Sequence, residues 1–228
     1  MLTSNDPKYK EKLATVLDTL HSVKENEAFF FVDEMGPYRV KKYGGKALVE
    51  KGKSSTVPEF QKNKGSIHAV AALEAYTNQL TWRFIEHKDA NAIISLFEQL
   101  KEKYRKKKQL YVTWDSISTH DAGLIHEWIE EVNQRADKQG HGVRFVIVPL
   151  PSRSQFLNVI ESVFGGMKRA VIHNSDYPSK QAMITAVDQH FVDRNAYFEK
   201  NPKRVGKKIW DREAFDLRRL EGGLFKKM

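Results

Sequence analysis

The spacing of apolar residues changes between residues 86 and 89, and this change restricts the possible folds more than any other feature. Before residue 86, short apolar runs follow one another with no amphipathic helix between them, which is typical of antiparallel strands in a meander. After residue 88, amphipathic helical patterns alternate with apolar runs, and strand–helix–strand units require parallel pairing. The expected strands cover 28–33, 66–73, 80–85, 109–114 and 143–148. The two patterns predict an α/β domain in which helices flank a mixed sheet.

The expected helices each carry one apolar stripe. The first covers residues 7–24 and precedes all the strands, and Asp89 is placed to cap the helix that follows the third strand. A later stretch over 156–169 is expected to be one continuous helix. Gly36-Pro37 indicates a turn, from which residues 38–42 would return as a further short strand.

Composition removes several classes of function. The absence of cysteine excludes disulfides, thiolate catalysis, cysteine-ligated zinc and iron–sulfur clusters. No apolar run approaches the ~20 residues that span a bilayer, and the amino terminus lacks a signal-peptide core, so we expect a soluble cytoplasmic protein without a membrane partner. The formal charge of +9 suits a polyanionic partner such as nucleic acid, although surplus surface lysine produces the same value.

Three acidic residues fall where one metal site would need them. Asp33 ends the first apolar run and Asp115 follows the fourth, so parallel neighbouring strands would bring both carboxylates to the edge of the sheet where ligands collect. Glu161 follows the apolar Ile160 on the next helix and can lie at the rim of that edge. Taken singly, each acid is more often a cap, a turn residue or a solvated side chain. Together they predict a site for magnesium or manganese, which prefer hard oxygen ligands.

Each of these acids lies within a longer motif. The first motif is Phe30-Phe31-Val32-Asp33-Glu34 followed by Gly36, and the second is Trp114-Asp115-Ser116-Ile117-Ser118-Thr119-His120. The third is Pro149-Leu150-Pro151 followed by Ser154-Gln155-Phe156-Leu157-Asn158-Val159-Ile160-Glu161. In this order the segments resemble the catalytic blocks of DDE transposases of the mariner-type insertion-sequence superfamily. The Leu-Asn-x-Ile-Glu core of the third segment is the most specific part.

The resemblance implies an RNase H-like fold and an enzyme of polynucleotide phosphoryl transfer. Such an enzyme cleaves phosphodiester bonds at transposon ends and joins the freed 3′-hydroxyl to target DNA. By the same resemblance, Asp33 would bridge two Mg²⁺ or Mn²⁺ ions, with Asp115 holding one and Glu161 the other. The neighbouring residues that would support these ligands are Glu34, Ser116, His120 and Asn158. Asn158 lies one helical turn before Glu161, where it could orient that carboxylate or cap the helix.

Departures from the family pattern leave two alternatives open. Ser116 stands where relatives usually have asparagine, and Gln155 and Val159 replace the two prolines of the third block. One alternative is another RNase H-like nuclease, such as a resolvase or a nuclease of RNA–DNA hybrids. The other is a decayed or domesticated DNA-binding protein that keeps the fold without turnover.

The basic residues that could contact DNA are expected on loops at the acidic edge of the sheet. Their contacts would be independent of sequence and sensitive to salt. These residues are Lys41, Lys42, Lys46, Lys51, Lys53, Arg153, Lys168 and Arg169. The densest basic run, residues 101–108, precedes the strand over 109–114 and would lie roughly 20 Å from the acids at its other end. We expect that run to be a solvated helix end.

The expected organisation is a helix or linker over 1–27, a catalytic domain over 28–199 and a basic tail over 200–228. The resembling transposases carry amino-terminal helix-turn-helix modules, whereas only one helix precedes the first catalytic strand here. We therefore expect either a separately encoded DNA-reading module or a catalytic fragment. The resemblance also implies a homodimer that acts on double-stranded DNA in the cytoplasm, associated with the nucleoid.

Overall fold

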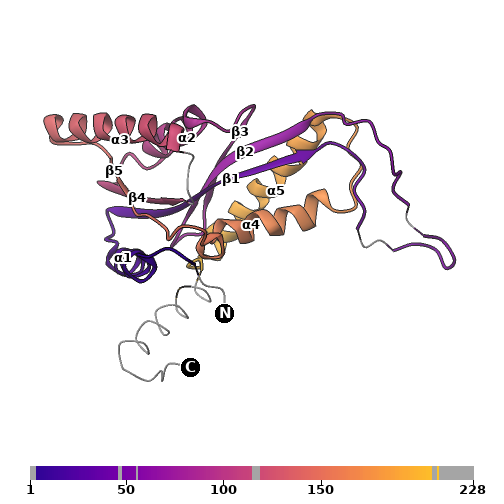
Figure 1. The fold of residues 1–228 in the computed structure, drawn as a ribbon, viewed down its shortest axis with the longest axis horizontal. Coiled ribbons are helices and arrows are strands. Elements are labelled where there is room, and N and C mark those ends of the chain that lie inside the picture. Colours follow the sequence, from indigo (N-terminus) through magenta and orange to yellow (C-terminus); the bar gives the residue numbers. More distant parts are fainter. Residues whose placement is uncertain (1–3, 46–47, 55, 115–118, 207–209, 211–228) are drawn as a thin grey trace, which may run out of the picture.

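A five-stranded mixed sheet forms the centre of the molecule, with the strand order β3-β2-β1-β4-β5 (Figure 1). The first three strands, β1 (Glu27–Arg39), β2 (Ser66–Glu74) and β3 (Leu80–Ile85), form an antiparallel meander. The last two, β4 (Gln109–Trp114) and β5 (Arg144–Ile147), run parallel to β1 and to each other. The predicted mixed sheet is confirmed.

The structure is a computed structural model that describes most of the chain. The described residues are 4–45, 48–54, 56–114, 119–206 and 210, with the side chains of residues 119–122 excluded.

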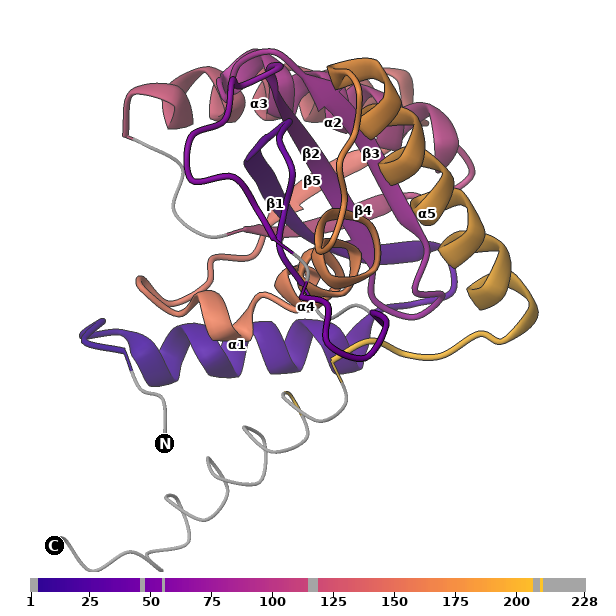
Figure 2. The same cartoon turned by 90° about the vertical axis from the view of Figure 1, so that its right-hand side faces the viewer.

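Helices cover both faces of the sheet (Figure 1 and Figure 2). One face is covered by α2 (Ala90–Lys103) and α3 (Thr119–Gln139). The opposite face is covered by α1 (Tyr9–Ser22), α4 (Ile160–Met167) and α5 (Lys180–Lys200). None of the helices in the described part of the chain is long and apolar enough to cross a lipid bilayer.

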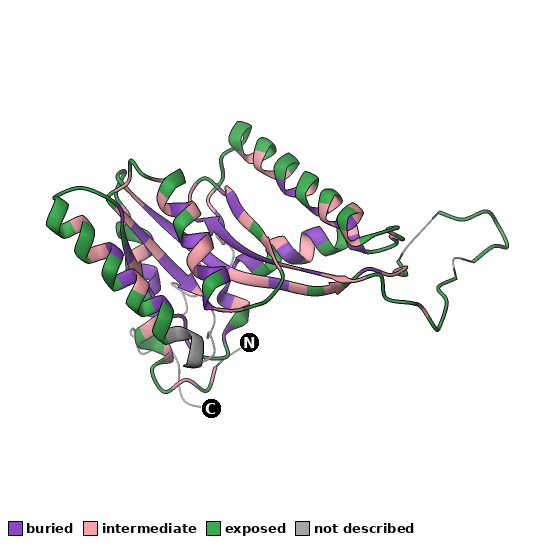
Figure 3. Ribbon diagram, turned by 90° about the horizontal axis from the view of Figure 1, so that it is seen from above, coloured by how far each residue is buried: buried purple, intermediate pink, exposed green. Residues whose placement is uncertain are grey.

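β1 contributes side chains to both hydrophobic cores. Successive residues of a strand point to opposite faces, so Phe29 and Phe31 enter the core beneath α1, α4 and α5. Phe30 and Val32 enter the core beneath α2 and α3. Because both faces are covered, the strand reads as a continuous apolar run, and Figure 3 shows the buried strands enclosed by helices with exposed outer surfaces.

β1 is longer than the sequence predicts. It continues through Gly36-Pro37 to Arg39, so the expected turn and the returning strand over 38–42 are wrong. The pairing of β1 with β2 is irregular between Met35 and Tyr38. Gly36 has a φ of 95°, and a Cβ atom there would lie 2.5 Å from the carbonyl oxygen of Ile67. The glycine therefore permits a bulge within a long strand, where a side chain would collide with the neighbouring strand.

The expected helix over 156–169 is divided into three parts. A 3-10 turn, η1 (Gln155–Leu157), precedes α4, and a π-helical segment, η2 (Lys168–Ile172), follows it. The break between η1 and α4 falls at Asn158 and Val159, and Asn158 bonds to β1 there. The predicted cap of α2 is confirmed, since the Asp89 carboxylate accepts a hydrogen bond of 2.8 Å from the backbone N–H of Ala92.

Between β1 and β2 the chain makes a long excursion beyond the sheet, seen at the right of Figure 1. Its base is tied to the turn after η2, because Tyr43 N donates to Ser175 O at 2.8 Å and Asn174 N donates to Gly44 O at 3.2 Å. Leu48 and Phe60 on this excursion have exposed fractions of 106% and 88%. The excursion thus presents large apolar side chains on a fixed base.

Candidate active site

Asp33 lies on β1 directly after the last described pair of residues between β1 and β4. Val32 pairs with Trp114, the last residue of β4, and Asp33 pairs with Ala71 on β2. Its side chain is half-buried and follows Phe31 on the face covered by α4. An acid is costly in the interior of a sheet covered on both faces. At the margin of the β1–β4 pairing, the carboxylate can reach polar partners and water.

Asn158 connects the segment before α4 to β1. Its Nδ2 atom donates to the carbonyl oxygen of Val32 at 3.0 Å and lies 3.4 Å from Oδ2 of Asp33. The other carboxylate oxygen of Asp33 accepts the backbone N–H of Glu34 at 2.8 Å. Asn158 is 1% exposed, so its side chain is held by these partners. The Asp33 carboxylate is therefore oriented by a backbone amide on one oxygen and a buried side-chain amide on the other.

Glu161 lies in the first turn of α4. Its backbone N–H donates to the carbonyl oxygen of Asn158 at 3.1 Å, and its side chain is exposed. Burial raises the pKa of the Tyr38 phenol on β1, and the negative charge of Glu161 raises that pKa further. Glu161 therefore lies close enough to β1 for its charge to affect the phenol of Tyr38. The same short turn thus carries Glu161 at its end and holds Asp33 through Asn158.

The chemistry of this site fits a hard divalent cation. Asp33 and Glu161 offer carboxylate oxygens, the ligand type that magnesium and manganese prefer. The Oδ1 atom of Asn158 is buried and has no hydrogen-bond partner among the described residues, so it can accept a hydrogen bond from a water on a nearby ion. Within the described ranges, no three acidic or histidine side chains gather closely enough to form a complete metal site.

Three of the predicted site residues follow β4. Asp115 and Ser116 lie outside the described residues. The backbone of His120 belongs to the first turn of α3, and its side chain is likewise outside the described part.

Glu34 is placed on the other face of the sheet from Asp33. It follows Val32 toward α2, and its carboxylate lies 3.4 Å from the ammonium of Lys88. The structure therefore brings together Asp33, Asn158 and the turn carrying Glu161, and it does not bring Glu34 to them.

The predicted DNA-contact residues fall into separate groups. Lys41 and Lys42 precede the base of the excursion, which is tied to the turn after η2. Lys168 and Arg169 are exposed at the start of η2. Arg153 is exposed on the loop between β5 and η1. On the excursion itself, Lys51 is exposed and Lys53 pairs with Glu50. Lys46 lies outside the described residues.

The dense basic run lies at the opposite end of β4 from Trp114. Several of its members have local partners that the sequence does not predict. The ammonium of Lys103 donates to Thr81 Oγ1 at 3.0 Å, and the ammonium of Lys107 donates to Glu25 O. Arg105 pairs with Glu102 at 2.8 Å. This run therefore helps to hold α2 and the start of β4 in place.

A hydrogen bond from the segment before α1 reaches the loop before η1. The carboxylate of Asp6 accepts the backbone N–H of Ser152 at 2.7 Å. The sequence Asp6-Pro7 ahead of an amphipathic stretch signals a helix start. It carries no signal for a partner so distant in the chain.

Comparison with known proteins identifies similarity at three levels. The DDE superfamily endonuclease family matches residues 28–184. A 39 kDa uncharacterized protein of insertion element IS630 from Shigella sonnei is 21% identical over 192 residues, which cover 84% of this chain and 52% of that protein. The chain thus spans about half the length of this curated relative.

Solved structures of Mos1 transposase share the fold. The paired-end complex with the left transposon end has a TM-score of 0.62 at 14% identity, covering 95% of this chain and 66% of that one. A pre-cleavage Mos1 transpososome has a TM-score of 0.60 at 14% identity, covering 95% and 64%. The Mos1 mariner paired-end complex with Mn has a TM-score of 0.58 at 14% identity, covering 87% and 59%. The expected RNase H-like fold is confirmed.

Proposed function

The chain belongs to the DDE superfamily of endonucleases, and from this premise we propose that it is the catalytic domain of a DNA transposase. The observation that carries the proposal is the contact of Asn158 with β1. A buried amide binds the strand beside Asp33, and the same turn leads directly to Glu161. This arrangement brings the first and third motifs together at one end of the β1–β4 pairing. The substrate would be the phosphodiester backbone at transposon ends.

The proposed metal ligands are Asp33, Asp115 and Glu161. Asp33 follows Val32 and Asp115 follows Trp114, and Val32 and Trp114 are strand partners, which supports assigning both acids to one site. When bound, two Mg²⁺ or Mn²⁺ ions would activate the attacking oxygen and stabilise the leaving oxygen of an in-line displacement. Mos1 mariner paired-end complexes were solved with Mn and with Mg, which supports this choice of ions.

The protein's own part in the reaction is to hold these acids in place. Asn158 keeps one oxygen of the Asp33 carboxylate in position, and the Glu34 N–H holds the other. The Asn158 carbonyl fixes the first turn of α4 and thereby the start of the helix that carries Glu161. Ligands that are oriented before an ion binds lose little freedom on binding it.

Double-stranded DNA is the proposed partner, both as transposon end and as target. The Mos1 structures that share this fold include a complex with the left transposon end. The exposed Lys168 and Arg169, with Lys41 and Lys42 on the adjoining segment, would track phosphates without reading sequence. A helix-turn-helix module, encoded separately or in a longer form of this chain, would then read the end sequence. The protein would act at the nucleoid in the cytoplasm.

A homodimer is the proposed assembly. The exposed apolar side chains on the excursion after β1 support this proposal, since a second copy of the chain would remove them from water. Leu48 and Phe60 are the most exposed of them. Replacing both with serine would shift a dimer toward monomer in sedimentation analysis.

The deciding experiment is nicking of end-bearing duplex DNA with Mg²⁺ or Mn²⁺. We expect Asp115→Asn to lose about three orders of magnitude in rate, because a metal supplies several kcal/mol and each 1.36 kcal/mol is tenfold. Asp18→Asn, an exposed aspartate on α1, is the matched control and should cut at the wild-type rate. Unchanged nicking by Asp115→Asn would refute the assignment.

The two alternatives give different results in the same assay. Cleavage confined to RNA–DNA hybrids or four-way junctions would favour another RNase H-like nuclease. Binding of duplex DNA without cutting by any variant would favour a decayed or domesticated DNA-binding protein.

A further inference from the structure

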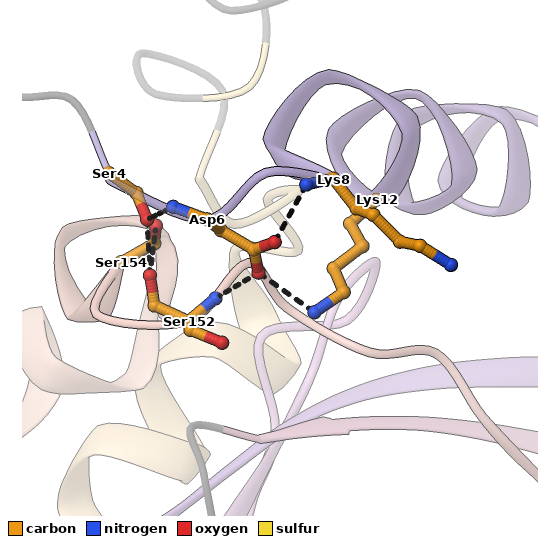
Figure 4. Close-up of polar contacts among 6 residues, drawn as sticks. All are labelled: Ser4, Asp6, Lys8, Lys12, Ser152 and Ser154. Carbon is orange, nitrogen blue, oxygen red and sulfur yellow. Dashed lines mark hydrogen bonds and ion pairs between the residues drawn. The ribbon is translucent and has the colours of Figure 1, made fainter.

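The segment before α1 is hydrogen-bonded to the loop that leads to Asn158 and Glu161 (Figure 4). Oδ1 of Asp6 accepts the backbone N–H of Lys8 at 2.8 Å. Oδ2 accepts the ammonium of Lys12 at 2.8 Å and the backbone N–H of Ser152 at 2.7 Å. Ser4 adds a second link, because its hydroxyl donates to the carbonyl oxygen of Ser152. The two segments are therefore joined through both backbone groups of Ser152.

Only part of this arrangement is needed to start α1. The bonds from Lys8 N to the Asp6 carboxylate and from Tyr9 N to Asp6 O, the latter at 3.0 Å, satisfy donors at the helix start. The bond from Ser152 N satisfies no group of α1. The Asp6 side chain is 5% exposed, so its position is set by these partners and not by solvent. Asp6 therefore has a second role that concerns the loop after β5.

The bonds to Asp6 are charge-assisted. The ammonium of Lys12, followed by the amides of Ser152 and Lys8, holds the pKa of the Asp6 carboxyl well below its usual range. The carboxylate is consequently ionised at neutral pH. A hydrogen bond from a backbone amide to an ionised carboxylate is stronger than one to a neutral acceptor, so the bond from Ser152 N to Asp6 is a strong one.

The segment from Ser152 to Glu161 can transmit this position to the candidate site. Ser154 is 1% exposed, and its carbonyl accepts Leu157 N at 2.8 Å. The carbonyl of Gln155 accepts Asn158 N at 2.9 Å, and that of Asn158 accepts Glu161 N at 3.1 Å. Consecutive turns are thus bonded to one another along the segment. A displacement of Ser152 would displace the turn on which Asn158 and Glu161 are placed.

We propose that Asp6 is a positioning residue for the turn carrying Asn158 and Glu161, and that Ser4 and Asp6 together clamp this turn against β1. This inference rests on the proposed function, since Asp6 would act on metal-dependent cleavage through Asn158 and Glu161. A residue that only starts α1 would affect stability alone. A positioning residue also affects the rate and the affinity for metal, because both depend on where the acids stand.

The experiment compares Asp6→Asn with two matched variants of the full chain. Asp18→Asn on α1 controls for the loss of an acid, and Lys12→Met removes the ammonium partner while leaving the bond to Ser152. For Asp6→Asn we expect the kcat of Mn²⁺-dependent nicking to fall roughly tenfold and the Mn²⁺ midpoint to rise roughly tenfold. The KM for DNA should stay within about twofold of wild type. Lys12→Met should lower the Tm and leave kcat and the Mn²⁺ midpoint unchanged.

Amide hydrogen exchange of Asn158 and Glu161 separates this inference from the proposed function. Faster exchange of these amides in Asp6→Asn, with wild-type exchange in Asp18→Asn, supports the clamp even if wild type proves unable to nick DNA. If wild type nicks and Asp6→Asn matches it in kcat, Mn²⁺ midpoint and exchange, the inference is overturned. Should Asp6→Asn fail to fold, Asp6→Ser replaces it, since a serine keeps an acceptor for Lys8 N but is too short to hold Ser152. The kcat, the Mn²⁺ midpoint and the amide exchange of Asp6→Ser then test the inference.

Discussion

Asp33 and Glu34 are neighbours on β1, and the sheet sends them to two different environments. Asp33 lies on the face of α4, where the buried amide of Asn158 reaches its carboxylate. Glu34 lies on the face of α2, where it forms a half-exposed ion pair with Lys88. The two acids differ by one methylene group and one position. On a strand covered on both faces, that one position decides which acid can join a site.

An asparagine on each face extends this comparison. Asn133 on α3 donates to Phe145 O at 2.9 Å and accepts Phe145 N at 2.8 Å, so its amide is satisfied by β5. Asn158 also bonds a strand carbonyl, but its Oδ1 has no partner among the described residues. Asn133 uses both the oxygen and the nitrogen of its side-chain amide in bonds to β5. The amide oxygen of Asn158 is left to accept a hydrogen bond from a water or another group outside the described residues.

The largest effect should separate the two neighbouring acids. Asp33→Asn should reduce nicking by about three orders of magnitude, since it removes a proposed metal ligand. Glu34→Gln should retain most of the activity, because its carboxylate faces α2. Rates with Mg²⁺ and Mn²⁺ on one duplex check this. Equal losses in both variants would break the comparison between the faces.

The next effect should separate the two asparagines. Asn158→Ala should lower activity roughly 10- to 100-fold, the usual cost of removing a partner of a metal ligand. Asn133→Ala should leave activity near wild type. Both variants should lose about 1–3 kcal/mol in the free energy of unfolding, because each removes a hydrogen bond to a strand carbonyl. Urea titration and nicking assays on the same samples provide the test, and a loss of activity that merely follows the loss of stability would count against the proposed site.

A smaller effect, on DNA binding, should separate the basic residues after α4 from those at the far end of β4. Replacing Lys168 and Arg169 with alanine should weaken DNA binding and reduce the slope of log K against log salt by about 2, one unit for each phosphate that the variant no longer neutralises. Replacing Lys106 and Lys108 at the end of the sheet far from Trp114 should leave the slope unchanged. Binding of random duplex at several salt concentrations measures both slopes. Equal slopes for the two double variants would remove the assignment of DNA to the α4 face.

The smallest effect belongs to the ion pair of Glu34. A double-mutant cycle of Glu34→Gln and Lys88→Met should give a coupling free energy of about 0.2–1 kcal/mol, as for other solvent-accessible pairs. Added salt should reduce it. A coupling of several kcal/mol would mean that the α2 face holds a strongly interacting charge cluster of its own, with Glu34 as a member.

Local patterns were enough for much of the fold. The strands over 80–85 and 109–114 have the predicted bounds, and Asp89 caps α2 as expected. The strands are predicted by the spacing of their apolar residues, and the cap is a hydrogen bond between residues within one helical turn of each other. The mixed sheet followed from the order of the patterns, because parallel pairing requires a crossover and a meander does not. The three acidic motifs were likewise readable in the sequence.

Other features depended on partners far away in the chain. Gly36-Pro37 reads locally as a turn, but pairing with β2 around Ile67 keeps β1 extended. The helix expected over 156–169 is interrupted where Asn158 turns its amide to Val32. The predicted role of Asn158 beside Glu161 rested on helical spacing, and only packing showed that its hydrogen bonds go to β1.

The sequence by itself determined the types of most elements and the class of sheet, and it predicted the candidate acids, because periodicity and motif are written in consecutive residues. The tertiary structure alone decided which faces Asp33 and Glu34 occupy, which amide holds Asp33 and that Asp6 reaches Ser152 across 146 positions. These contacts arise from hydrogen bonds between segments that meet only after the sheet and its helices have packed. Their partners are specified by the geometry of the whole fold and not by spacing along the chain.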